Sequence, residues 1–75
     1  MGNKTNEDLN IKIGILLQRA REGKNITQKE IAEYTGYSKN HISAVEGGVC
    51  KASIELLLGY CEIINVDPNT ILDYK

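Results

Sequence analysis

Hydrophobic residues recur along this chain with the period of an α-helix, and they predict an all-α protein without strands. In the first third of the chain, one helical stripe consists of Leu9, Ile13, Leu16, Leu17 and Ala20. The helix should begin after a frayed segment of residues 1–6 and end near Glu22, before the polar run 23–25. Ile11 and Ile15 fall on its opposite side.

Residues 27–35 predict a second, short helix with a well-marked start. Thr27 and Glu30 have the spacing of a capping box, in which each side chain bonds the other's backbone N–H. The helical period places four residues on the side that should pack, namely Ile31, Ala32, Tyr34 and Thr35. Gly36, which tolerates a positive φ, then predicts a sharp turn into the next helix.

Ser38 should cap a third helix whose two faces differ in character. Ile42 and Val45 point inward, whereas the outward arc is small and polar and holds Lys39, Asn40, Ser43, Ala44 and Gly47. A helix that is only solvated usually carries long charged side chains spaced for mutual support. This arc instead offers side chains of the kind that read base edges.

The C-terminal third predicts two further helices. Ser53 should cap a fourth helix that runs to about Ile64, with a core arc of Ile54, Leu57, Tyr60, Cys61 and Ile64. Leu56 and Ile63 lie outside that arc, and Gly59 allows another backbone to approach closely. Asp67 and Pro68 open a fifth helix, which Ile71, Leu72 and Tyr74 complete.

Composition limits the class of protein. A chain of 75 residues predicts one domain over residues 1–75, whose small core would gain from dimerisation. The two cysteines, Cys50 and Cys61, come without a signal peptide or a membrane-spanning run, so we expect a cytoplasmic protein without a disulfide. One histidine and two cysteines do not complete a typical zinc site, and no catalytic constellation is apparent, so we expect no metal, no cofactor and no enzyme.

The net charge of −1 argues against a strongly basic nucleic-acid-binding domain, but the charges are unevenly distributed. Residues 1–22 and residues 23–52 each carry four basic and three acidic groups, whereas residues 53–75 carry one and four. The acidic charge is therefore concentrated in the C-terminal third of the sequence. A nucleic acid would meet a nearly neutral to mildly basic surface.

The central helices resemble the helix-turn-helix of phage repressors and Cro proteins, the Xre-like family. The similarity lies in Gln28, Ala32, Gly36, Ile42 and Val45, in the ending Glu46-Gly47-Gly48, and in Ile13-Gly14, Leu17 and Arg21 of the first helix. It covers roughly residues 13–72. The resemblance implies a compact five-helix, lambda-repressor-like fold whose helix-turn-helix spans residues 27–47. It also implies an ion pair between Arg21 and Glu46.

The resemblance further implies sequence-specific binding of double-stranded DNA, as a repressor-like transcriptional regulator that acts as a homodimer on a pseudo-palindromic operator. The residues expected to contact DNA are Thr27, Gln28, Lys29, Ser38, Lys39, Asn40, Ser43 and Lys51. Of these, Thr27 and Gln28 would hold phosphate, and Gln28 would also steady the third helix. Lys39, Asn40 and Ser43 would face bases. Phosphate contacts from the loop 48–52 are expected from Lys51 alone, because this loop departs from the family pattern.

Exposed apolar residues leave a second interpretation open, a protein-interaction module such as an antitoxin or adaptor. Its contacts would come from Ile11, Ile15, Leu56 or Ile63. For the homodimer, the expected interface consists of Leu56, Ile63, Ile71 and Tyr74, with Ile11 and Ile15 as the alternative surface. We expect no membrane partner.

Overall fold

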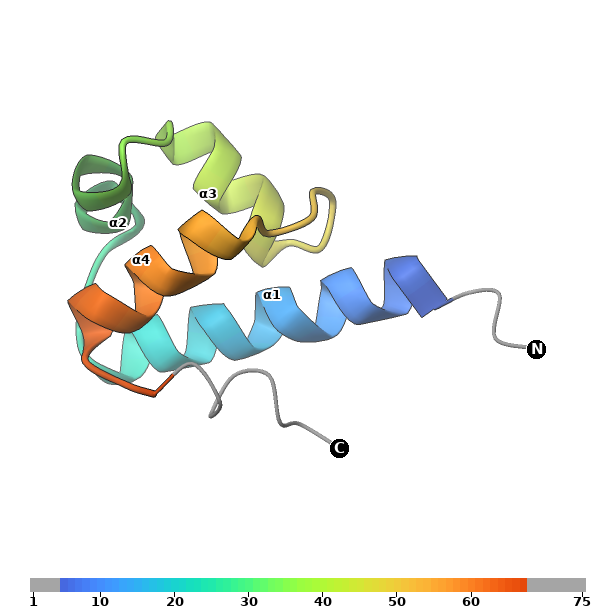
Figure 1. The fold of residues 1–75 in the computed structure, drawn as a ribbon, viewed down its shortest axis with the longest axis horizontal. Helices are drawn as coiled ribbons and strands as arrows, with labels where there is room; N and C mark the ends of the chain where they lie inside the picture. The colour runs from blue at the N-terminus through green and yellow to red at the C-terminus, as the bar shows by residue number, and fades with distance from the viewer. Residues whose placement is uncertain (1–4, 68–75) are drawn as a thin grey trace.

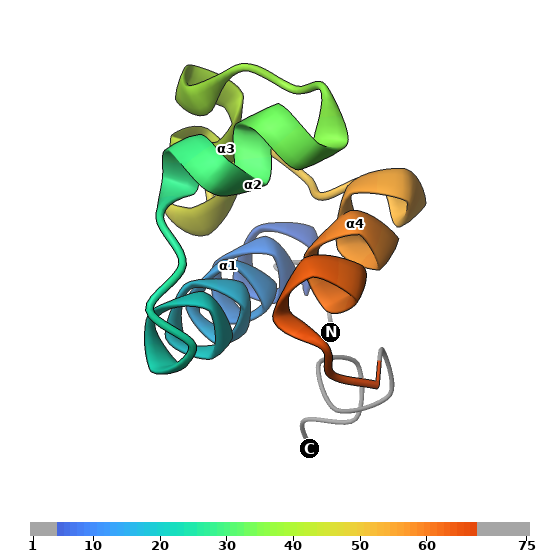
Figure 2. The ribbon, with the colours of Figure 1, turned by 90° about the vertical axis from the view of Figure 1, so that its left-hand side faces the viewer.

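The computed structural model describes residues 5–67, which fold into four α-helices. The helices are α1 (Thr5–Gly23), α2 (Gln28–Thr35), α3 (Lys39–Glu46) and α4 (Ile54–Ile64). Helices α2 and α3 lie together across one side of the pair formed by α1 and α4 (Figures 1 and 2). The prediction of an all-α fold is confirmed for the described residues, and the predicted fifth helix, which begins at Pro68, lies outside them.

Local sequence signals account for most of the helix boundaries. The predicted capping box is present: the N–H of Glu30 donates to Thr27 Oγ1 over 3.1 Å, and the N–H of Thr27 donates to the Glu30 carboxylate over 2.8 Å. Ser38 and Ser53 cap α3 and α4 as predicted. Helix α1 starts at Thr5, slightly earlier than predicted, and ends at Gly23.

The turn between α2 and α3 depends on a glycine. Gly36 has a φ of 86° and a ψ of −1°, a left-handed conformation that glycine adopts readily and most other residues do not. Its N–H donates to the Ala32 carbonyl over 2.9 Å, which closes α2. Only Tyr37 and Ser38 separate Gly36 from α3, which starts at Lys39.

The core is built from all four helices. Its buried apolar side chains are Leu17, Ile31, Ile42, Val45, Leu56, Leu57, Tyr60, Cys61 and Ile64. The predicted inward positions of α3 and the predicted burial of Cys61 are therefore confirmed.

Several predicted burial assignments are wrong. On α4, Leu56 is fully buried, whereas Ile54 is 68% exposed. The buried arc of α4 is turned by about 30° from the predicted one at ~100° per residue, because the helix packs against both α1 and α2. Tyr34, predicted to pack, is 54% exposed, since its hydroxyl reaches across the surface to Glu62 on α4. Leu9 is exposed because it lies in the first turns of α1, which project beyond α4 (Figure 1).

Helix α1 packs against the end of α3 without a side chain between them. A Cβ atom placed on Gly14 would lie only 2.5 Å from the Val45 carbonyl oxygen and 2.6 Å from that of Glu46. A side chain at this position would force the two helices apart. Gly14 therefore sets the distance between α1 and the C-terminal end of α3.

Candidate nucleic-acid interface

The first turns of α3 present a polar surface. Lys39, Asn40 and Ser43 are all exposed, and the side chain of the capping residue Ser38 accepts a hydrogen bond from the His41 N–H over 3.0 Å. On the opposite side of the helix, Ile42 and Val45 are buried. Because α3 is anchored by its apolar side, its polar side chains point into solvent, where they are available to a ligand.

The start of α2 lies beside the start of α3. A shallow depression is lined by residues from both helix starts and the end of α1, including Thr27, Lys29 and Lys39. Two lysine side chains, one from each helix, therefore share this depression. Helix N-termini carry unpaired N–H groups and partial positive charge, so the arrangement suits an anionic oxygen such as that of a phosphate.

Gln28 has an inward role as well as a place in this depression. Its side chain is half-buried, and Nε2 donates a hydrogen bond of 3.0 Å to Oε1 of Glu46. The amide N–H₂ thus links the start of α2 to the end of α3, the steadying contact that the family resemblance implied. Its backbone N–H and the side-chain carbonyl oxygen remain as the polar groups with which Gln28 can meet a ligand.

Glu46 is the centre of a hydrogen-bond network that joins all four helices. Its carboxylate is buried, and Oε2 accepts from Nε of Arg21 over 2.8 Å and from the Tyr60 hydroxyl over 2.6 Å. Oε1 accepts from Nη2 of Arg21 over 2.9 Å and from Gln28. Arg21 also donates from Nη1 to the Ile26 carbonyl over 2.8 Å. The carboxylate therefore has four charge-assisted hydrogen bonds to compensate its loss of hydration.

The network determines the protonation of its members. Burial alone would raise the pKa of Glu46, but the hydrogen bonds from Arg21, Tyr60 and Gln28 outweigh it and hold the pKa below its ordinary value. The hydrogen bond to Glu46 raises the pKa of Arg21. Burial, followed by the hydrogen bond to Glu46, raises the pKa of Tyr60. At neutral pH the carboxylate and guanidinium are therefore charged and the phenol is neutral.

Sequence reasoning anticipated the Arg21–Glu46 ion pair through family resemblance but missed Tyr60. Periodicity places Tyr60 in the core but indicates no partner for its hydroxyl. A buried tyrosine usually finds a hydrogen-bond partner, and this rule was the available signal. Tyr60 connects α4 to the end of α3, so the orientation of α3 is supported from the side opposite its polar arc.

The remaining predicted contacts are spread around this surface. Lys51 is exposed in the loop after α3, and neighbouring Cys50 is half-buried and packs against the core. Tyr37 in the α2–α3 turn and His41 in the first turn of α3 stack with ring centroids 5.0 Å apart. Tyr37 bounds the polar surface on the side of α4, because its hydroxyl lies 2.9 Å from that of Ser53, the N-cap of α4.

The predicted dimer interface is not supported in the form in which it was proposed. Leu56 was expected to face outward, but it is fully buried and has no surface to offer a partner. Ile63 is partly buried and packs against the core, because the buried arc of α4 is turned toward Leu56 and Ile63 relative to the predicted arc. Ile71 and Tyr74 lie outside the described residues. On the alternative surface, Ile11 and Ile15 are both exposed.

Together, the four-helix arrangement and the solvent-facing polar arc of α3 define a small helical domain that presents one helix to a ligand. The sequence pattern of the helix-turn-helix domain matches residues 14–75, which is most of the chain. The chain belongs to this helix-turn-helix family, which confirms the resemblance to Xre-like proteins.

Solved structures share the fold. The restriction-modification controller protein C.AhdI from Aeromonas hydrophila is similar with a TM-score of 0.76 and 22% sequence identity, over 83% of this chain and 94% of that chain. The clp gene regulator ClgR from Corynebacterium glutamicum is similar in two structures, with TM-scores of 0.82 and 0.80 and 29% identity. Both cover 87% of this chain, and they cover 69% and 84% of the respective ClgR chains. A comparison with curated protein sequences gives no match.

No helix within residues 5–67 combines the length and the apolar character needed to cross a lipid bilayer.

Proposed function

We propose that this protein binds double-stranded DNA in a sequence-specific manner and regulates transcription in the cytoplasm. In this proposal α2 and α3 form the helix-turn-helix, and α3 enters the major groove as the recognition helix. The observation that carries the proposal is the exposed arc of Lys39, Asn40 and Ser43, on a helix whose other side is fixed in the core. Membership of the helix-turn-helix family and similarity to ClgR, described as a gene regulator, support it.

The side chains of the arc suit base edges. Lysine donates to O6 and N7 of guanine, asparagine pairs with N6 and N7 of adenine, and serine accepts or donates. All three lie in the first five residues of α3, the part of a recognition helix that usually contacts bases. Ala44 and Gly47, farther along the same side, are small enough to let the helix lie close to the groove wall.

Phosphate contacts would come from the two adjacent helix starts. Thr27 caps α2, Gln28 and Lys29 are its first residues, and Ser38 caps α3, so backbone N–H groups and a lysine face the same region. Lys51 would add a contact from the loop after α3. Because the protein carries a net charge of −1, its affinity would depend on these fitted contacts more than on overall charge.

The proposed regulator acts as a homodimer on a pseudo-palindromic operator, with recognition helices about 34 Å apart to enter successive major grooves. Since Leu56 is buried, the interface would use other residues of the C-terminal third or the exposed pair Ile11 and Ile15. Sedimentation of wild type and Ile15→Glu at micromolar concentrations separates these surfaces. A monomeric wild type on DNA would contradict the dimer.

Selection of bound duplexes from a random pool tests the proposal directly. We expect wild-type protein to enrich one motif, with two inverted half-sites if it binds as a dimer. The double variant Lys39→Ala/Asn40→Ala should lose the enrichment while retaining its helical circular dichroism, because both side chains are exposed. The matched control is Arg19→Ala, which removes an exposed cation from α1. Failure of wild type to enrich any motif, or equal loss in the control, would refute the assignment.

A protein-interaction module remains the second candidate, and one observation favours it. Ile11 and Ile15 are 45% and 40% exposed on α1, and Val49 in the loop after α3 is 80% exposed. A Cβ atom on Gly48 would contact Ile11, so the loop and this part of α1 are adjacent. Such a contiguous apolar surface suits a protein partner. An Ile11→Ser/Ile15→Ser variant that retains DNA selection but loses a co-purifying protein would assign this surface to that partner.

A further inference from the structure

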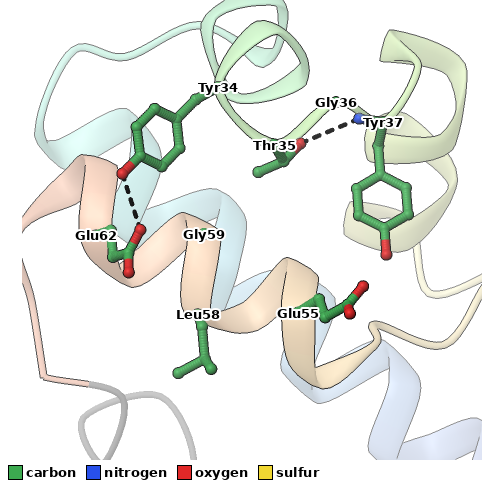
Figure 3. A pocket seen from close by; sticks show the side chains of 8 residues that line it. All are labelled: Tyr34, Thr35, Gly36, Tyr37, Glu55, Leu58, Gly59 and Glu62. Atoms are coloured by element: carbon green, nitrogen blue, oxygen red, sulfur yellow. Dashed lines mark hydrogen bonds between the residues drawn. The ribbon is translucent and has the colours of Figure 1, made fainter.

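A groove with a chemical character of its own lies between the C-terminal end of α2 and helix α4 (Figure 3). Its walls combine aromatic, aliphatic and acidic side chains, from Tyr34, Tyr37, Glu55, Leu58 and Glu62. Helix α4 approaches α2 closely at the groove floor, where a Cβ atom on Gly59 would lie 2.6 Å from the Thr35 methyl group. Both helices therefore contribute to one continuous surface.

The two tyrosine rings are held in place by their hydroxyl groups. Tyr34 donates a hydrogen bond of 2.8 Å to Oε1 of Glu62, and the Tyr37 hydroxyl lies 2.9 Å from the hydroxyl of Ser53 (Figure 3 shows the first of these contacts). Each bond runs from the α2 side of the groove to α4 or its cap. The rings are thus positioned before any ligand arrives, which lowers the cost of ordering them on binding.

The groove is acidic. Its lining contains two carboxylates and no lysine or arginine. Within the described part of the chain, the Glu55 side chain makes no hydrogen bond or ion pair, and the second carboxylate oxygen of Glu62 makes no hydrogen bond. The two residues are seven positions apart on α4, which places them about 10 Å apart along the helix axis. From 53 to 67 the chain has three acidic residues and no basic one.

We propose that this groove binds a lysine- or arginine-rich segment of a partner protein. A long basic side chain has an apolar stem and a cationic head, and the groove offers Leu58, 46% exposed, and two tyrosine rings beside two carboxylates. The spacing of Glu55 and Glu62 accommodates more than one basic residue of an extended segment. Ion pairs with carboxylates and cation–π contacts with the rings act together on such a ligand.

The groove and the proposed DNA-contacting surface are separate. The groove lies at the C-terminal end of α2, whereas the lysine-lined depression lies at the N-terminal end of the same helix. Its carboxylates would repel a phosphate backbone, so the groove would stay open in a DNA complex. The proposal goes beyond DNA binding and does not depend on it, because it can be tested on the free protein.

The test uses a fluorescent Gly/Ser peptide with arginine at every third position. Its affinity for the protein is measured by fluorescence anisotropy at low and at physiological salt. The 75-residue chain and its variants Glu55→Gln and Glu62→Gln are compared, and ¹⁵N chemical-shift mapping locates the peptide. We expect each variant to weaken binding about twofold to fivefold, and the double variant about tenfold. The matched control Glu33→Gln removes the same charge from an exposed position of α2 outside the groove.

The proposal is supported if the shifts fall on the groove residues and the control binds like wild type. It is overturned if saturable binding is absent at millimolar peptide, or if a peptide with glutamine in place of arginine binds equally. If Glu33→Gln weakens peptide binding as much as the groove variants do, the peptide responds to overall charge and the proposal is also overturned. Sedimentation of the same variants tests whether a second copy of this chain occupies the groove instead. If wild type is a dimer and Glu55→Gln or Glu62→Gln dissociates it, the groove holds that second copy and the proposal is wrong.

Discussion

Tyr60 donates a hydrogen bond of 2.6 Å to the carboxylate of Glu46, and this contact ties α4 to the last residue of α3. Arg21 holds the same carboxylate from α1, and Gln28 holds it from α2. The C-terminal end of α3 is therefore fixed by three other helices, whereas its N-terminal end carries the exposed polar arc. The network sets the angle at which that arc is presented.

Breaking the Arg21–Glu46 pair from either side should be strongly destabilising. Arg21→Ala leaves a buried carboxylate with less compensation, and Glu46→Ala leaves a buried guanidinium. Each single variant should lose about 3–5 kcal/mol of unfolding free energy, because an uncompensated buried charge remains. The double variant should lose less than the sum of the two, with a coupling of about 1–3 kcal/mol in a urea-denaturation cycle. Additive losses would mean that the two charges act independently.

Removal of the Tyr60 hydroxyl should change the unfolding free energy at neutral pH and its dependence on pH in the alkaline range. Tyr60→Phe keeps the ring but removes a hydrogen bond to a buried charge, for which we expect a loss of about 1.5–3 kcal/mol. Because folding raises the pKa of Tyr60, its contribution to the unfolding free energy is complete below the pKa of tyrosine in the unfolded chain, about 10. Stability should then fall as pH rises above that value.

The alkaline fall is the specific test of the Tyr60 contact. Unfolding free energies measured from pH 8 to 11 should decline more steeply for wild type than for Tyr60→Phe. The matched control is Tyr34→Phe, in which an exposed hydrogen bond to Glu62 is lost instead. The hydrogen bond to Glu62 also raises the pKa of Tyr34, but Tyr34 is exposed and its interaction is screened by solvent, so the control should keep most of the wild-type slope. Identical slopes in wild type and Tyr60→Phe would show that the buried phenol does not govern the alkaline transition.

Glu46 should govern part of the acid transition. Folding lowers the pKa of Glu46, so its contribution to stability is complete above the unfolded value of about 4.3 and is lost as pH falls through the folded value. Unfolding free energies of wild type between pH 2 and 6 should therefore decline below about pH 4. Glu46→Gln, which does not ionise, should be less stable at neutral pH and show a shallower decline. A decline as steep as that of wild type would assign the acid transition to other carboxylates.

Local signals in the sequence were enough to predict how the helices begin and end. The capping box of Thr27 and Glu30, the turn at Gly36 and the caps Ser38 and Ser53 all depend on residues within four positions of one another. Such contacts form wherever the segment is helical, so no knowledge of the packing was needed. The polar arc of α3 was predictable for the same reason.

Contacts between distant segments were harder to predict. Periodicity fixes which residues share a face but leaves open how the helix is turned about its axis against its neighbours, and for this reason the pattern predicts Leu56 outside the core and Ile54 inside it. The Tyr60–Glu46 bond spans two helices, and nothing in the spacing of these residues predicts it. The ion pair to Arg21 was expected only because a family resemblance supplied the long-range information.

Gly14 should be intolerant of even the smallest side chain. An alanine Cβ would lie 2.5 Å from the Val45 carbonyl oxygen, a backbone atom that moves only if α1 or α3 moves. We expect Gly14→Ala to lower stability by about 1–3 kcal/mol, as overpacking of a core does. Gly23→Ala is the control, because no atom lies within 4 Å of its Cβ position and alanine favours a helix. Thermal unfolding of both variants compares them, and a harmless Gly14→Ala would rule out the close approach.

The proposed recognition helix makes a prediction about specificity that can be separated from affinity. Asn40 lies in the first turn of α3, where its side chain is exposed and takes no part in the Glu46 network, so its substitution should leave the fold intact. Asn40→Ala should cost about 1–3 kcal/mol at a single base position in each half-site of the selected sequence. On duplexes that carry a different base pair at that position, the affinity of Asn40→Ala should differ little from that of wild type.

Lys29→Ala provides the contrasting case, because Lys29 is exposed at the start of α2, off the arc of α3. As a phosphate contact, it should contribute equally on every sequence, and its loss should reduce the slope of log K against log salt by about 0.9 for each bound subunit. Titrations of both variants on the selected and on scrambled duplexes, at several salt concentrations, distinguish the two roles. If Asn40→Ala weakens both duplexes equally while Lys29→Ala discriminates between them, α3 is not the helix that reads the bases.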